Sequence, residues 1–243
     1  MVEVRPIDGL PEIAPGDDLV PLLRQAADFE RGDIIVVTQK IVSKSLNLFA
    51  DLSDVEVSGE AQRLADLTLK DPRLVELVLQ ESTDIVRAVP RILITRHHSG
   101  CVMANAGIDQ SNIGPGKEDR VLLLPRNPDA VAQDLRTRLG SNAPAIIISD
   151  SFGRPWRLGV ASIAIGAAGL PALVDMRGTQ DRDGREMQVT QIALADMVAC
   201  AAGLVMGEGC EGIPAALVRG LQWTAPDIAA AGLVRPLSED LFQ

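Results

Sequence analysis

The chain has 243 residues, and its 23 Lys and Arg against 33 Asp and Glu give a formal net charge of −10. A hydrophobic content of 47% excludes a mainly disordered protein, and the acidic balance argues against nucleic acid as a partner, because a polyanion would be repelled. No apolar run reaches the roughly 18 to 20 residues of a membrane helix, and the first ten residues lack the pattern of an export signal. With only three cysteines, we expect a cytoplasmic protein with reduced thiols and no membrane contact.

The predicted elements of the first half mix strands and helices. A helix capped by Asp17 or Asp18 follows an opening strand, and Asp71-Pro72 divides a pair of later helices, since proline suits a first helical turn. Continuous apolar runs predict buried strands. The predicted strands are 2–7, 33–39, 91–96, 101–106 and 121–125, and the predicted helices are 19–29 and two within 59–80.

The second half begins with an amphipathic helix that starts at Asp129. Residues 144–150 form the clearest strand, and residues 158–171, which are small and apolar, fit either a tightly packed helix or a strand pair. A long buried helix over 190–206, a strand over 215–220 and a short helical tail complete the prediction. Strands and helices alternate without a regular βαβ rhythm, which favours an α+β or irregular α/β fold over a doubly wound sheet. A division near residue 140 is only weakly marked.

Two polar segments follow predicted strands. Asp150 ends a buried strand between two hydroxyls, Ser149 and Ser151, a set of oxygen donors that Mg²⁺ or Mn²⁺ prefers; the alternative is that Asp150 caps the next turn. Residues 105–112 add Asp109 as a second metal carboxylate and Asn112 as an amide for a base or phosphate. Asn, Asp and Gly also dominate ordinary turns, so an Asx-rich turn remains an alternative.

Two further segments suit a nucleotide. Residues 206–214 contain a GxGxxG pattern, but a helix is predicted before it and a strand after it, the reverse of a dinucleotide-binding site. The loop could present backbone N–H groups to phosphates, with Glu208 and Glu211 as metal ligands, or it could be a flexible connection. Residues 38–44 place a hydroxyl, an amide and two lysines after a strand. Neither they nor Gly114, Pro115, Gly116 and Lys117 supply a P-loop.

Together these segments predict a metal-dependent site for an anionic, phosphate-bearing ligand. Acidic residues would hold the metals, while Lys44 and backbone amides would hold the phosphates. A Ser-His-Asp hydrolase is disfavoured, because the chain has no GxSxG and only two adjacent histidines.

Taken in order, the segments resemble the coenzyme F420-0:L-glutamate ligase family, the γ-glutamyl ligases of deazaflavin biosynthesis. The resemblance spans nearly the whole chain. It rests on residues 9–13 with 16–18, 32–44, 105–112, 150–154, and 206–214 with 218–220. Ser151 stands where the family carries Thr, and Ser45, Leu46 and Asn47 stand where it continues Ala-Glu-Gly.

The resemblance implies a GTP-dependent ligase in which the F420-0 carboxylate becomes an acyl phosphate and the amine of L-glutamate displaces the phosphate, with further γ-linked glutamates possible afterwards. It implies two Mg²⁺ or Mn²⁺ ions on Asp109, Asp150, Ser151 and Glu208, with Lys44, Asp109 and Asp150 as the catalytic residues. The implied GTP contacts are Leu10, Pro11, Glu12, Ile13, Thr38, Gln39, Lys44, Asn112, Met206, Gly207, Glu208, Gly209, Cys210, Glu211, Gly212 and Ile213.

The family's fold implies an intertwined α+β homodimer, and a potassium requirement would fit the family. We expect one ligase domain over residues 1–243, without the nitroreductase-like domain that some bacterial relatives carry after it. Two alternatives remain from the residues alone. One is a metal-dependent phosphatase or nucleotide hydrolase with the same acidic site, and the other is a nucleotide-binding protein without catalysis.

Overall fold

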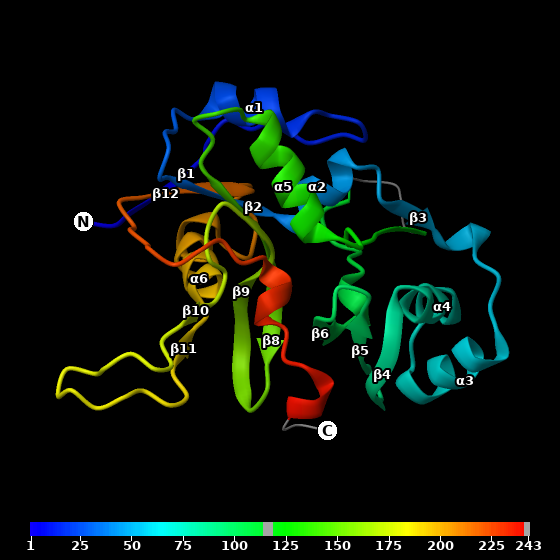
Figure 1. Ribbon diagram of the computed structural model, residues 1–243. Helices are drawn as coiled ribbons and strands as arrows, with labels where there is room; N and C mark the ends of the chain where they lie inside the picture. The colour runs from blue at the N-terminus through cyan, green and yellow to red at the C-terminus, as the bar shows by residue number, and fades with distance from the viewer. Residues whose placement is uncertain (114–118, 241–243) are drawn as a thin grey trace.

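A five-stranded mixed sheet forms the centre of the computed structural model, which describes residues 1–113 and 119–240 (Figure 1). Within this sheet β2 and β8 run parallel, and the other neighbours are antiparallel. The residues Gly114, Pro115, Gly116 and Lys117, considered above for a P-loop, lie outside the described ranges. The strand order is β1 (Glu3–Pro6), β12 (Ala215–Arg219), β2 (Ile34–Thr38), β8 (Ala145–Arg154) and β9 (Arg157–Ala168).

Both faces of the central sheet are covered. Strand β2 sends Ile35 and Val37 into one apolar cluster and Ile34 and Val36 into the other, which explains its unbroken apolar sequence. Helices α1 (Leu19–Ala26) and α5 (Pro128–Arg138) lie on the first side, and α6 (Leu194–Met206) covers the second (Figure 1). The α+β prediction is therefore confirmed.

Local capping explains where these helices begin. Asp18 accepts a hydrogen bond from the Val20 N–H and starts α1, as predicted. Helix α5 starts at Pro128 after the cap residue Asn127, one residue before the predicted start. Asp129 has another task, because its carboxylate accepts the backbone N–H groups of Ala167, Ala230 and Ala231 and so ties the C-terminal segment to α5.

A third apolar cluster forms among helices and strands that lie to one side of the central sheet (Figure 1). Its helices separate at Asp71-Pro72, as predicted, and Asp71 caps the second of them. A 3-10 turn, η2 (Asn105–Gly107), leads from this cluster to Asp109. The helices are α3 (Gly59–Thr68) and α4 (Pro72–Gln80), and the strands are β3 (Phe49–Asp51), β7 (Arg120–Leu122), β4 (Ser82–Val89) and β5 (Ile92–His97). Strand β6 (Val102–Ala104) pairs with β5, and its Met103 packs in the first cluster.

Two predictions near the site are corrected. Residues 158–171 form neither a helix nor a strand pair of their own: most of them belong to the single long strand β9, whose partner is β8. Their small size serves close packing, since a Cβ on Gly166 would lie 2.5 Å from the Pro128 carbonyl oxygen. Strand β8 also continues to Arg154, so Asp150 lies inside a strand rather than at its end.

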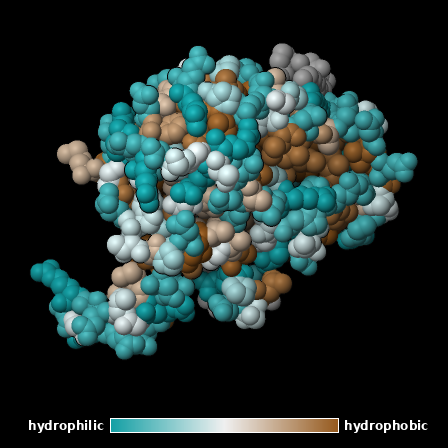
Figure 2. Space-filling model, turned by 45° about the horizontal axis from the view of Figure 1, so that its top comes forward, coloured by the Kyte–Doolittle hydropathy of each residue, from teal (hydrophilic) through white to brown (hydrophobic). Residues whose placement is uncertain are grey.

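Other elements were not predicted. Helix α2 (Gln39–Ser45) follows β2 directly, and β4 was missed. The described part of the C-terminal tail contains two 3-10 turns, η3 (Ala230–Leu233) and η4 (Leu237–Glu239), rather than an α-helix. Strands β10 (Val174–Asp175) and β11 (Gln191–Ile192) form the base of a mainly hydrophilic arm that projects from the body (Figures 1 and 2). Among the described residues, no helix has the length and apolar character to span a membrane.

Candidate functional site

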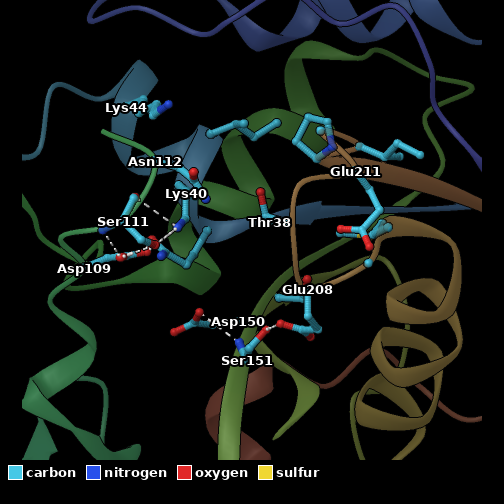
Figure 3. Close-up of a pocket in the computed structure, with 18 of the residues that line it drawn as sticks. Thr38, Lys40, Lys44, Asp109, Ser111, Asn112, Asp150, Ser151, Glu208 and Glu211 are labelled. Carbon is cyan, nitrogen blue, oxygen red and sulfur yellow. Dashed lines mark hydrogen bonds and ion pairs between the residues drawn. The ribbon is translucent and has the colours of Figure 1, made fainter. Parts of the chain in front are cut away.

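A cavity of about 730 Å³ lies where β2 ends (Figure 3). Strand β2 leads through Thr38 into α2, β8 supplies Asp150 and Ser151, and the loop after α6 closes the opposite wall. All residues that the family resemblance implies for metal or nucleotide contacts line this one cavity. They are Leu10, Pro11, Glu12, Ile13, Thr38, Gln39, Lys44, Asp109, Asn112, Asp150, Ser151, Met206, Gly207, Glu208, Gly209, Cys210, Glu211, Gly212 and Ile213.

Helix α2 carries two lysines with different partners. The Lys44 side chain is only 7% exposed, and its Nζ forms an ion pair with the exposed Glu12 carboxylate. The Lys40 Nζ lies 2.5 Å from Asp109 Oδ2 and donates to Ser111 Oγ at 2.9 Å (Figure 3). The two positive charges therefore reach different parts of the cavity wall.

A left-handed backbone segment places Asp109. Asn105, Ala106 and Gly107 all have positive φ (52°, 52° and 72°), a run that is costly for residues other than glycine and that collects at functional sites. Asp109 Oδ1 accepts both the N–H and the hydroxyl of Ser111. Burial alone would raise the pKa of Asp109, but the hydrogen bonds from Lys40 and Ser111 outweigh it and hold the pKa below its usual value.

Asp150 has the opposite electrostatic environment. Burial, together with the carboxylates of Asp109 and Glu208, raises its pKa to about 7, although the Ser151 N–H and the Lys40 charge oppose this shift. Ser151 Oγ donates to Glu208 Oε2 at 2.6 Å, which links β8 to the loop after α6. The negative charge at this end of the cavity is thus only partly compensated by the protein.

The glycine-rich loop connects α6 to β12, in the helix-then-strand order that the sequence predicts. Gly207 ends α6 with φ of 76°, and its N–H bonds to the Gly203 carbonyl. The Gly207 φ of 76° and ψ of 175° lie in a backbone region that is essentially restricted to glycine, so glycine is required there. Glu211 accepts the Gly209 N–H and braces the loop.

The donor set fits a divalent ion in its chemistry. Asp109, Asp150, Ser151 and Glu208 offer carboxylate and hydroxyl oxygens, the ligands of Mg²⁺ and Mn²⁺. The pKa of Asp150, raised to about 7, marks a position where an added cation would be stabilised. In the described ranges, no three His, Cys, Asp or Glu side chains are already gathered in a metal-binding arrangement.

Sequence reasoning missed part of the lining. Ser162 on β9 lies opposite Ser151, and its hydroxyl is 3.4 Å from Glu208 Oε1. In the sequence, Ser162 is recognisable only as a polar residue within a small apolar segment. Its place in the site becomes evident once β9 is known to pair with β8. Asn105, Ser111 and Lys40, which the sequence indicates only as parts of polar segments, also line the cavity, and Lys40 bonds to the Asp109 carboxylate.

Fold and cavity together define an α+β protein with a charge-mixed polar cavity at the end of a central strand. The profile of the F420-0:Gamma-glutamyl ligase family matches residues 9–220. Similar curated proteins are the coenzyme F420:L-glutamate ligases of Methanopyrus kandleri (42% identity, 100% of this chain and 98% of the relative), Methanothermobacter thermautotrophicus (40%, 98% and 97%) and Haloarcula marismortui (43%, 90% and 87%). The chain belongs to the F420-0:gamma-glutamyl ligase family and is an enzyme of the ligase class.

Proposed function

We propose that this enzyme joins L-glutamate to F420-0 in a GTP-dependent reaction, through an acyl phosphate. Family membership and the names of the relatives support the ligation itself. The GTP dependence and the acyl phosphate are supported by one observation: all the expected nucleotide and metal contacts line the same cavity of about 730 Å³.

In the proposed first step, an oxygen of the F420-0 carboxylate attacks the γ-phosphorus of GTP. The bond from this phosphorus to the β,γ-bridging oxygen breaks, so GDP leaves and an acyl phosphate forms. The chain contributes by positioning, which is the main source of rate enhancement in phosphoryl transfer. Lys44, which is nearly buried and paired with Glu12, would pair with phosphate oxygens, and the backbone of residues 207–213 would contact others.

In the proposed second step, the neutral amine of L-glutamate attacks the acyl carbon. The carbon–oxygen bond to phosphate breaks, and the departing inorganic phosphate takes the proton that the amine loses as the amide forms. The cavity walls would exclude water, which would otherwise hydrolyse the acyl phosphate. Repetition on the γ-carboxylate of the added glutamate would lengthen the tail.

The proposed divalent ions, Mg²⁺ or Mn²⁺, would be held by Asp109, Asp150, Ser151 and Glu208. When bound, they would neutralise negative charge on the phosphates. The Ser151–Glu208 hydrogen bond and the bonds of Ser111 to Asp109 orient these oxygens toward the cavity (Figure 3).

We also propose a homodimer. Apolar side chains on β9 and α6 are exposed, namely Leu158 (98%), Val160 (53%), Met197 (60%) and Leu204 (88%), and a second copy would cover them. Light scattering after size exclusion tests this. Leu204→Glu is expected to yield monomer, while Leu67→Glu, on the exposed side of α3, keeps the dimer.

Mass spectrometry of the product tests the ligase reaction directly. The protein is incubated in a potassium buffer with F420-0, GTP, L-glutamate and Mg²⁺ or Mn²⁺, and each of these four components is omitted in turn. In parallel samples ATP replaces GTP, or sodium replaces potassium. We expect a product heavier by one or more glutamyl units that requires all four components. Phosphate release without glutamate as the main reaction would instead indicate a phosphatase or nucleotide hydrolase. Metal-independent GTP binding without turnover would indicate a binding protein.

A further inference from the structure

Lys40 is the ammonium group that bonds directly to a carboxylate of the proposed metal set. Its Nζ contacts Asp109 Oδ2 at 2.5 Å, Ser111 Oγ at 2.9 Å and the Ser111 carbonyl oxygen at 3.3 Å. An ammonium has three N–H donors, so these three acceptors satisfy it completely. The Lys40 and Asp109 side chains are 25% and 23% exposed, so solvent screens their attraction only in part.

Lys44 provides a comparison within the same helix. It also carries an ammonium, but its acidic partner is Glu12, outside the proposed metal set. Figure 3 shows Lys44 pointing away from Asp109 and Asp150, while Lys40 points to Asp109. The Lys40 charge also acts on Asp150, whose ionised form it favours. The Lys40 charge therefore lies at the proposed metal site, whereas the Lys44 charge lies at another part of the cavity wall.

We propose that Lys40 is a resident counter-cation of the acidic site, which competes with a divalent ion for Asp109 and thereby couples ion binding to nucleotide binding. This inference rests on the proposed divalent ions and adds a role for a residue outside their ligand set. An ion approaching Asp109 meets an ammonium already on Oδ2 and is repelled by it. The triphosphate would supply new acceptors for the ammonium and new negative charge for the ion, so each ligand would favour the other.

Removal of Lys40 has two opposing effects on ion affinity. The variant loses one bond that orients Asp109, which weakens ion binding, and it loses a repelling charge, which strengthens it. The orienting loss is small, because Asp109 Oδ1 keeps the Ser111 N–H and hydroxyl. The charge effect is larger, since a unit charge a few ångströms from the ion acts in a partly buried site.

The test is a titration with Mn²⁺ alone, followed by electron paramagnetic resonance, for the wild type, Lys40→Met, Lys40→Arg and Lys44→Met. We expect Lys40→Met to bind Mn²⁺ at least about ten-fold more tightly than the wild type without nucleotide. Lys40→Arg, which keeps the charge, and Lys44→Met, which removes the same charge elsewhere on α2, should each stay within about two-fold. A non-hydrolysable GTP analogue should strengthen Mn²⁺ binding in the wild type much more than in Lys40→Met.

The proposal is wrong if Lys40→Met binds Mn²⁺ no more tightly than the wild type, if no variant binds it, or if Lys44→Met gains as much. Circular dichroism melts verify folding, and Lys40→Gln replaces Lys40→Met if the latter unfolds. The glutamylation assay on the wild type distinguishes a failure of the Lys40 proposal from a failure of the proposed ligase reaction. An active ligase without the Mn²⁺ effect overturns only the role of Lys40, whereas an inactive protein that shows the effect overturns only the proposed reaction.

Discussion

Asp150→Asn is expected to stabilise the protein in the absence of divalent ions, increasingly so as the pH rises. The folded protein holds Asp150 with a pKa of about 7, against 3.8 for an ordinary aspartate. Below about pH 4 both states are protonated. Between pH 4 and pH 7 the unfolded chain ionises while the native state keeps its proton, so the native state loses stability as the pH rises, and above pH 7 the loss is complete.

The size of this loss of stability follows from the difference between the pKa of Asp150 in the folded and in the unfolded protein. About three pH units at 1.36 kcal/mol each give an upper bound of about 4 kcal/mol. Because Asp150 keeps some exposure to the cavity, we expect roughly half of this, about 2 kcal/mol, after screening. The asparagine keeps the shape of the side chain and cannot ionise, so the variant should lack this pH dependence.

Urea unfolding in EDTA at pH 5, 6, 7 and 8 measures the difference between Asp150→Asn and the wild type. The difference should widen up to pH 7 and then level off, and added Mn²⁺ should narrow it at pH 8 by stabilising the wild type alone. Gln180→Ala, on the exposed arm, removes no ionisable group and is the control; its difference from the wild type should not vary with pH. An Asp150→Asn difference equal at pH 5 and pH 8 would refute the electrostatic reasoning.

Three other predictions concern stability. Burial lowers the pKa of His97 to about 4, so only the unfolded chain gains a proton there as the pH falls from 6.5 to 4. Over that range the free energy of unfolding of the wild type should fall by up to about 3 kcal/mol relative to that of His97→Gln. A difference between the two proteins that stays constant over this pH range in urea unfolding would contradict this. Asp129→Ala leaves three backbone N–H groups without their acceptor and should cost about 2–4 kcal/mol in urea unfolding, whereas Asp134→Ala, exposed on the same helix, should stay within about 0.5 kcal/mol. Gly107→Ala places a Cβ 2.2 Å from a leucine methyl and should lower the melting temperature more than Gly178→Ala, which has a similar φ but no neighbour within 4 Å; equal losses would show that backbone strain alone matters.

Much of the architecture could be predicted from the sequence because its signals are local. Asp18 caps a helix within two residues of itself, and Pro72 marks a first helical turn, so neither depends on distant contacts. The apolar run of β2 was equally clear, since a strand buried on both faces needs no polar positions. The polar segments around Asp109 and Asp150 were recognisable because their residue types match a known family.

Only the tertiary structure decided how those segments meet. A run of small apolar residues has no helical or strand period, so β9 became identifiable through its pairing with β8, and that pairing brings Ser162 opposite Ser151. The contact of Lys40 with Asp109 joins residues 69 positions apart, counted from their numbers, and depends on how α2 lies against the turn after η2. Burial raises the pKa of Asp150, whereas at Asp109 the hydrogen bonds from Lys40 and Ser111 outweigh burial and lower the pKa. The sequence by itself determined which chemical groups this protein has, and the packing of distant segments determined which of them share a charge environment.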